Sequence, residues 1–382
     1  MVYLWGRQWS RGELLARVGR LEQLAGVQLV EAADGAERGV RLLRFGTGAG
    51  FDFEVLVDRG FDIGRAWLGG RPLTWWSPVG LTGPWYHEPA GIGWFRGFAG
   101  GLVSTCGLDQ VQLGGTDDAT VFNYPHRATE TYGLHGRYTG LPARLAGYGT
   151  TWSGNECVLW AEAEVLQAAV FGEQLLLNRR IEADLGGTSV RIADTVTNVG
   201  ATACPHMLLY HCNVGFPVVD DGAEIAYPAP AGICVSEASS PDYRQLAGPE
   251  PAFVEECYEH DMAPDSAGYV TAAVLNPAAG LGVYQRYRKD QLPHHVTWRQ
   301  LGSGTYVIAM EPSTNRDAGR FDARERGELI HLVPGEQRHY ELELGALTGA
   351  GDVEAFRARN QELAAGHGMT GPTATLATGA TG

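Results

Sequence analysis

TTWSGNECVLWAEAEV (150–165) is a stretch in which apolar and polar side chains largely alternate. The same period of two returns in LLLNRRIEAD (175–184) and in TSVRIADTVTNV (188–199). This period places successive side chains on opposite faces of a β-strand. A glycine-containing connection, LGG at 185–187, separates the last two stretches. The three stretches therefore predict neighbouring β-strands.

Strands of the same kind are predicted along most of the chain. They are VQLVEA (27–32), GVRLLRF (39–45), FDFEVLV (51–57), FDIGRAWL (61–68), CPHMLLYHCNVGF (204–216), GYVTAAVLN (268–276), LGVYQRYRK (281–289), HHVTWRQL (294–301), GTYVIAME (304–311), GELIHLV (327–333) and HYELELGAL (339–347). Helical segments do not alternate with them, which favours antiparallel pairing over a parallel α/β arrangement. We predict an all-β fold, a large antiparallel β-sandwich with minor helices at the termini.

Two helices and one domain complete the predicted organisation. Ser10 is a plausible N-cap for a helix over 10–24, and a second helix is expected over 351–366. The stretch 236–251 indicates a long surface loop rather than a linker. The predicted units are a helical extension (1–25), one β-sandwich domain (26–348), a C-terminal helix (349–366) and a disordered low-complexity tail (367–382).

The composition limits the classes of partner. Hydrophobic residues make up 44% of the 382 positions, enough for a sizeable core. The formal net charge of -15 argues against nucleic acid or an anionic membrane surface as a partner. No apolar run approaches the roughly 18 residues of a membrane span. We expect no nucleic-acid and no membrane partner, and a monomer or a homodimer.

The cysteines and the N-terminus bear on location. The six cysteines form no C-x-x-C pair, as expected for reduced thiols in the cytosol. The first 24 residues carry arginines through their only apolar stretch and show no export signal. We therefore expect a cytoplasmic protein.

Cofactor motifs are missing from the sequence. It contains no G-x-x-x-x-G-K-[ST] loop, no strand–G-x-G-x-x-G–helix unit and no G-x-S-x-G elbow. The 11 histidines show no recognised metal-ligand spacing. We predict that the protein uses no cofactor and no metal.

Three residues stand out as candidates for acid–base chemistry. His135 lies between Gly133 and Gly136, His211 lies in the strand MLLYHCN, and Glu311 ends the strand YVIAM. An ionised carboxylate and a protonatable imidazole suit a reaction that moves two protons. Each residue also has an ordinary interpretation: a polar turn residue for His135, a hydrogen-bonded core histidine for His211, and a surface glutamate before a proline turn for Glu311.

The order of motifs resembles the galactose mutarotase (aldose 1-epimerase) superfamily. VDRGFDIGRAWLGGRPLTWWSP (57–78) is similar to its opening segment and LHG (134–136) to its first histidine motif. LYHCNVGFP (209–217) resembles the strand of its second histidine, EPSTN (311–315) the segment of its glutamate base, and LVPGEQRHYELELG (332–345) its closing strand. The stretch 85–110 departs from the galactose and hexose-phosphate enzymes and resembles an uncharacterised bacterial branch.

The resemblance implies roles for these residues. Glu311 would be the base that removes the anomeric proton, His211 the acid that protonates the ring oxygen, and His135 a group that orients the sugar. Arg96 would hold sugar hydroxyls and Trp298 would offer an apolar platform, although either side chain could instead be structural. Weaker pocket candidates are Asp109, Asn123, His126 and His206. We predict that His135, His211, Glu311 and Arg96 line one concave pocket.

The function implied is cofactor-free interconversion of sugar anomers, with a small sugar as substrate. One alternative keeps the same acid–base pair for epimerisation or elimination next to a carbonyl, on a keto or acidic sugar. A second alternative is a non-catalytic carbohydrate-binding protein. Binding alone does not require an acid–base pair, so the presence of His135, His211 and Glu311 argues against this second alternative.

Overall fold

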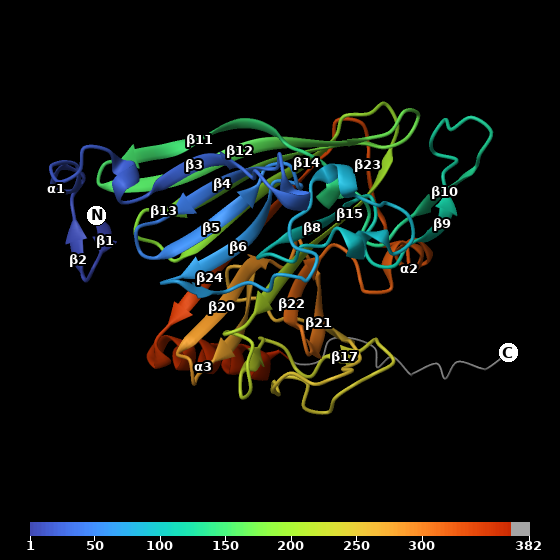
Figure 1. The fold of residues 1–382 in the computed structure, drawn as a ribbon. Helices are drawn as coiled ribbons and strands as arrows, with labels where there is room; N and C mark the ends of the chain where they lie inside the picture. Colours follow the sequence, from blue (N-terminus) through green and yellow to red (C-terminus); the bar gives the residue numbers. More distant parts are fainter. Residues whose placement is uncertain (368–382) are drawn as a thin grey trace.

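The computed structural model describes residues 1–367, and these form three main antiparallel sheets (Figure 1). The eight-stranded sheet has the order β11 (Arg144–Ser153), β12 (Glu156–Ala168), β13 (Gln174–Asp184), β14 (Ser189–Asn198), β24 (Gln337–Thr348), β20 (Leu281–Arg288), β19 (Tyr269–Asn276), β16 (Glu224–Ala226). The all-β antiparallel prediction is confirmed.

The second sheet has seven strands and faces the first. Its order is β17 (Ile233–Cys234), β18 (Glu256–His260), β21 (His294–Gly302), β22 (Thr305–Ser313), β15 (Cys204–Gly215), β23 (Ile330–Leu332), with β8 (Ser104–Leu108) also paired to β15. The third sheet has the order β3 (Gly26–Glu31), β4 (Arg41–Gly46), β5 (Phe51–Leu56), β6 (Asp62–Leu68), β7 (Arg71–Pro72). Two hairpins, β1 (Val2–Leu4) with β2 (Arg7–Trp9) and β9 (Gly115–Asp118) with β10 (Thr129–Tyr132), lie outside these sheets.

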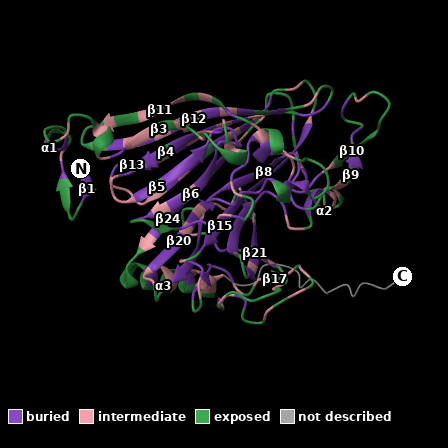
Figure 2. Cartoon of the chain, viewed as in Figure 1, coloured by how far each residue is buried: buried purple, intermediate pink, exposed green. Residues whose placement is uncertain are grey.

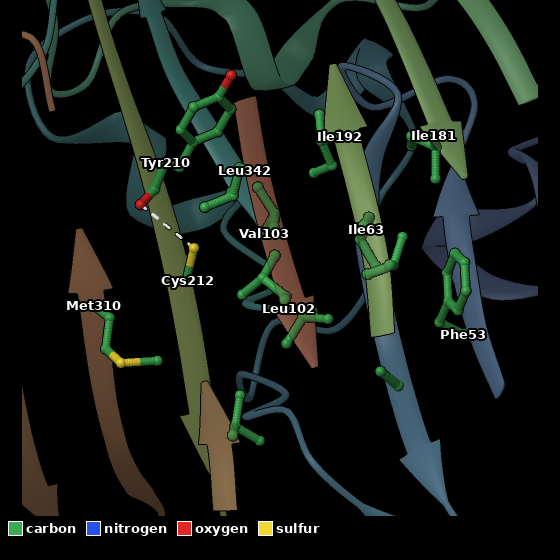
Figure 3. Close-up of a cluster of buried hydrophobic side chains, with 14 of the residues drawn as sticks. Phe53, Ile63, Leu102, Val103, Ile181, Ile192, Tyr210, Cys212, Met310 and Leu342 are labelled. Atoms are coloured by element: carbon green, nitrogen blue, oxygen red, sulfur yellow. Dashed lines mark hydrogen bonds between the residues drawn. The ribbon is translucent and has the colours of Figure 1, made fainter. Parts of the chain in front are cut away.

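The hydrophobic core fills the space between the sheets (Figure 3). Ile192 and Leu342 come from the eight-stranded sheet, Cys212 and Met310 from the seven-stranded sheet, and Phe53 from the five-stranded sheet. Along β14, buried residues such as Ile192 alternate with more exposed ones, as the period of two predicts.

Strand β15 differs because every one of its residues is buried (Figure 2). Leu208 and Tyr210 belong to the main core, whereas Met207 and Leu209 belong to a second cluster on the other face. Both faces of the strand are therefore covered, and one of them carries His211.

The helices differ in part from the sequence predictions. α1 spans Arg11–Leu15, shorter than the predicted 10–24, and is followed by the 3₁₀ helix η1 (Leu21–Gln23). Ser10 does cap α1, in a reciprocal capping box with Glu13. Only Leu14 of α1 is buried, so little packing supports a longer helix. Residues before it form the β1–β2 hairpin rather than a helical extension.

Two further helices complete the described chain. α2 (Gly319–Glu325) was not predicted, and α3 (Ala350–Gly366) packs across β16, β19, β20 and β24. The loop 236–251 carries no helix or named strand, and the remaining 3₁₀ helices are η2 (Gly35–Glu37), η3 (Pro84–Tyr86), η4 (Gly93–Arg96) and η5 (Tyr138–Gly140). No helix within residues 1–367 is long and apolar enough to span a membrane. The predicted tail lies outside the described residues, apart from His367.

Candidate active site

His211 and Glu311 face each other across the pairing of β15 with β22. Cys212 pairs with Met310 and Asn213 with Ala309, so the register brings His211 opposite Glu311 on one face of the sheet. His211 Nε2 lies 3.2 Å from Glu311 Oε1, and the two side chains are only 5% and 3% exposed. Within the described chain, Glu311 Oε1 and His211 Nδ1 are buried without a hydrogen-bond partner.

His135 approaches this pair from a tight loop. Its backbone has a left-handed φ of 55°, and its ring centroid lies 5.7 Å from that of His211. The backbone N–H of Gln112 donates a hydrogen bond to His135 Nδ1 at 3.3 Å. A neutral His135 ring therefore carries its proton on Nε2. His135 therefore presents a hydrogen-bond donor.

The glycines beside His135 allow close packing of the backbone. A Cβ on Gly136 would lie 2.7 Å from the Gly107 carbonyl oxygen, and one on Gly133 would lie 2.0 Å from that of Pro89. These glycines therefore let the loop pack against neighbouring backbone. The close packing holds His135 in place.

Aromatic rings surround the two histidines. Trp94 and Phe98, at the two ends of the WFRGF segment, lie with ring centroids 4.6 Å from His135 and 5.1 Å from His211, respectively. Trp298 on β21 lies 5.6 Å from His211. We call Trp94 and Phe98 the aromatic cover. This cover keeps water from the pair, which strengthens electrostatic interactions there.

Burial shifts the pKa of each group at the centre. The pKa of Glu311 is raised well above its usual value by burial and, secondarily, by the charges of Asp317 and Glu255. Burial lowers the pKa of His211 to about 4. The pKa of His135 falls well below its usual value through burial and the neighbouring His211.

These directions give the His211–Glu311 pair one shared proton over a wide pH range. A neutral imidazole beside a protonated carboxyl group holds the same number of protons as an imidazolium beside a carboxylate. The two states differ only in which partner carries the proton, so the macroscopic titration belongs to the pair. The pair can therefore take one proton from a ligand and give another back.

Two carboxylates that the sequence interpretation missed adjoin the pair. Glu255 accepts a hydrogen bond from Trp298 Nε1 at 2.8 Å. Asp317, whose amide donates to Glu259 at 2.8 Å, has its pKa raised to about 6 by burial and by Glu259 and Glu255. Asp317 follows EPSTN by two residues, so the motif itself was a signal for it. Glu255 comes near only through the β18–β21 pairing.

Four predicted pocket residues lie elsewhere. Arg96 is exposed and forms an ion pair with Glu88 at 2.8 Å. In η4, Trp94 turns inward, which directs the Arg96 side chain away from the pair. Asn123 and His126 are exposed in the loop between β9 and β10. His206 is on the core face of β15, bonded to Tyr340 and the Leu108 carbonyl. The prediction that Arg96 joins the pocket is wrong.

Asp109 is buried in a polar cluster of its own. Its Oδ1 accepts a hydrogen bond from Gln167 at 2.6 Å, and burial together with the charge of Glu173 raises its pKa to about 6. Asp109 thus serves this cluster rather than the His211–Glu311 pair. Of the predicted site residues, the structure brings together His135, His211, Glu311 and Trp298.

A large surface hollow lies away from this pair. It has a volume of about 1270 Å³ and lies on the five-stranded sheet, lined by residues that include Arg44 and Trp67. A smaller void of about 10 Å³ is lined by residues that include Phe98 and Ser104, but neither His211 nor Glu311. His211 and Glu311 are the candidate site because ionisable groups that can exchange protons meet there, whereas cavity size alone does not define a reactive site. Within residues 1–367, no group of three or more His, Cys, Asp or Glu side chains is placed to hold a metal.

Comparison with solved structures identifies the fold. A "putative aldose 1-epimerase" from Klebsiella pneumoniae shares the fold with a TM-score of 0.78 at 21% identity, over 90% of each chain. A galactose mutarotase-like protein from Clostridium acetobutylicum gives 0.58 at 12% identity, covering 84% of this chain and 99% of its own. Galactose 1-epimerase from Lactobacillus acidophilus gives 0.53 at 13%, covering 85% and 99%. The chain therefore has the galactose mutarotase-like fold.

The chain belongs to the family described as Domain of unknown function (DUF4432), whose model matches residues 37–346. No curated protein matches the sequence. The resemblance inferred from the motifs is thus confirmed for the fold.

Proposed function

We propose that the protein is a cofactor-free carbohydrate isomerase that interconverts the anomers of a sugar. The observation that supports this proposal is the 3.2 Å contact between His211 Nε2 and Glu311 Oε1, buried under aromatic rings and without other hydrogen bonds at Oε1. A pair whose polar atoms all have hydrogen-bond partners would serve to hold the fold together. A pair with unpartnered polar atoms can form hydrogen bonds with a ligand.

The reaction begins with the imidazolium–carboxylate form of the pair. Glu311 removes the proton from the anomeric hydroxyl while His211 gives its proton to the ring oxygen. The bond between the anomeric carbon and the ring oxygen breaks, and an open-chain aldehyde forms. The pair then holds its proton on Glu311 and a neutral His211.

Ring closure reverses the proton transfers. The aldehyde rotates about the bond to its neighbouring carbon and presents its other face. His211 takes the hydroxyl proton as the oxygen attacks, and Glu311 returns its proton to the former carbonyl oxygen. Because the pair begins and ends with one proton, no co-reactant is needed.

The surrounding residues orient the sugar. The Nε2 donor of His135 binds a sugar oxygen, and Trp298 supplies an apolar face for the ring. The aromatic cover must move to admit the sugar, because His211 and Glu311 are nearly inaccessible. Glu255 and Asp317 would repel an anionic substrate, which argues against the alternative of chemistry on an acidic sugar.

The test is anomer exchange in freshly dissolved α-sugars, followed by proton NMR with and without protein. The proposal expects faster equilibration for at least one neutral aldose, and loss of this effect in Glu311→Gln. If no sugar in a panel of neutral and charged aldoses equilibrates faster with the protein present, the proposal fails.

A further inference from the structure

The hollow on the five-stranded sheet has features of a ligand site, although the proposed reaction does not use it. We call this hollow the outer groove. It lies over the outward face of the five-stranded sheet and shares no lining residue with the surroundings of His211 and Glu311. Its volume of about 1270 Å³ is above the roughly 300–1,000 Å³ of most small-molecule pockets. It therefore has room for more than one sugar ring.

The register of the sheet explains why the hollow exists. One row across four strands consists of Gly26, Gly46, Asp52 and Trp67, each paired with the next. The two glycines leave half of this row without side chains, while Asp52 and Trp67 rise at the other end. The row spans about 14 Å, three strand spacings. The result is a trough with an aromatic ring at one end.

The next row supplies polar groups. Gln28 pairs with Arg44, and Arg44 pairs with Glu54. Arg65 binds Glu54 through two hydrogen bonds of 2.9 and 3.0 Å. Arg44 Nε lies 3.7 Å from Glu54 Oε1, an ion pair without a hydrogen bond. Among residues 1–367, the Arg44 side chain makes no hydrogen bond, and it lines the groove.

Asp52 is the matching acceptor. Within the described chain it has no hydrogen-bonding or ionic partner, and its pKa is raised by burial with no cation to oppose the shift. Tyr148 of β11 lines the trough as well and adds a second aromatic ring. An unpaired carboxylate, a guanidinium with unused hydrogen-bond donors and two aromatic rings are the groups that hold hydroxyls and the apolar face of a sugar.

The charges identify the class of ligand. Three arginines line the groove, and they are balanced by three carboxylates. The six residues are Arg20, Arg44, Arg65, Glu22, Asp52 and Glu54. A groove without net charge does not favour a polyanion or a polycation. We propose that the outer groove binds a neutral oligosaccharide, at a site separate from the His211–Glu311 pair.

Three variants of the full-length protein test this proposal. Trp67→Ala removes the aromatic platform, Asp52→Asn removes the charged acceptor, and Gly46→Val fills the trough. Gly46 does not have a left-handed φ, and the atom nearest its new Cβ is the mobile Asp52 Oδ1 at 3.0 Å, so valine can be accommodated. Trp160→Ala is the matched control. Trp160 also lies beside an arginine, Arg180 at 5.1 Å, as Trp67 does beside Arg65 at 5.5 Å, but it does not line the groove.

Binding is measured by saturation-transfer NMR and calorimetry with neutral tri- and tetrasaccharides. We expect each groove variant to weaken binding about tenfold or more, which matches the loss of one charged hydrogen bond. Trp160→Ala should bind normally, and melting temperatures identify any variant that has unfolded. Anomer exchange should change less than about twofold in the groove variants.

Other outcomes overturn the proposal. One is that no neutral oligosaccharide binds. Another is that the three groove variants bind the oligosaccharide as tightly as the wild-type protein does. The third is that a monosaccharide substrate displaces the oligosaccharide, which would show that both use the same site. Failure of anomer exchange would leave this test unaffected, because binding is measured directly.

Discussion

Tyr210 and His211, neighbours on β15, each contact a buried carboxyl group, and the two carboxyl groups differ greatly in how many hydrogen bonds they accept. Tyr210 donates to Asp194, which is bound by Arg179, and Arg179 also binds Asp62. Asp62 accepts two further hydrogen bonds from Thr105. One residue along the strand, on the opposite face, His211 meets Glu311 with polar atoms left unpaired.

The difference separates a structural group from a candidate reactive one. The Arg179 cluster is fully buried and each charge has a partner, so its bonds serve the fold. The His211–Glu311 pair is equally buried but unsaturated, which destabilises the protein unless a ligand completes it. Hydrogen-bond satisfaction, rather than burial, distinguishes the two.

The largest effect on rate is expected from Glu311→Gln. The amide keeps the shape but cannot act as a base, so turnover should drop by roughly 10²–10⁴-fold while sugar binding survives. His211→Asn should lose a similar factor. The double variant should be little worse than either single one, because the two residues act as a unit. Anomer-exchange NMR measures the rates, and full activity in Glu311→Gln would remove the mechanism.

The largest effect on stability is expected on the other face of the strand. Arg179→Met leaves Asp62 and Asp194 buried without their cation, which should cost about 3–5 kcal/mol. Glu311→Gln should change the stability much less, since it removes no partner-bound charge. Urea unfolding of both variants measures the difference, and equal losses would show that the two clusters do not differ as described.

The pH profile should be broad. Protonation of His211 below about pH 4 gives the pair a second proton and removes its base form. Ionisation of Glu311, whose pKa burial raises well above its usual value, removes the last proton and with it the acid. Activity should therefore hold from about pH 4 up to the raised pKa of Glu311, with an acid limb well below the ordinary imidazole pKa of about 6.5. An acid limb with its midpoint at that ordinary value would show that burial does not control the titration of His211.

A smaller effect is expected from Asp317→Asn. The charge of Asp317 contributes to the raised pKa of Glu311, so its removal should shift the alkaline limb of the profile to lower pH. The shift appears only above about pH 6, where Asp317 itself is ionised. Measured rates across pH 5–10 would detect it, and an unchanged alkaline limb would exclude the coupling. Activity on neutral sugars at lower pH should stay the same.

The smallest effect is expected from His135→Asn. This change keeps a hydrogen-bond donor but alters its reach, so KM should rise several-fold while kcat changes little. A loss of kcat as large as that of His211→Asn would instead give His135 a part in proton transfer. The comparison uses initial rates of anomer exchange over a range of sugar concentrations.

The sequence predicted those features that depend on local periodicity. Alternation in MLLYHCN and YVIAM assigned His211 and Glu311 to definite faces of their strands, and the antiparallel fold followed from many such strands. The register that brings them together joins segments about 100 residues apart, so only the family resemblance pointed to it.

The features that the sequence did not reveal depend on contacts between distant segments, or on the turn η4, which the sequence did not predict. Arg96 lies in the aromatic segment WFRGF, but η4 turns Trp94 inward and leaves Phe95 and Arg96 exposed. Glu255 is brought in by strand pairing, and the glycines beside His135 are required by carbonyl oxygens from other segments. Neither relation leaves a periodic signal.

Complete burial of β15 has a consequence for hydrogen exchange. Its amide protons can exchange only when the whole sheet unfolds, whereas the short 3₁₀ segment that carries Trp94 can open locally. His211 therefore sits on one of the slowest-exchanging parts of the chain, beneath one of the faster ones. In the proposed reaction, local opening of the segment that carries Trp94 and Phe98 would therefore limit the entry of the sugar, rather than any motion of the strand that carries His211.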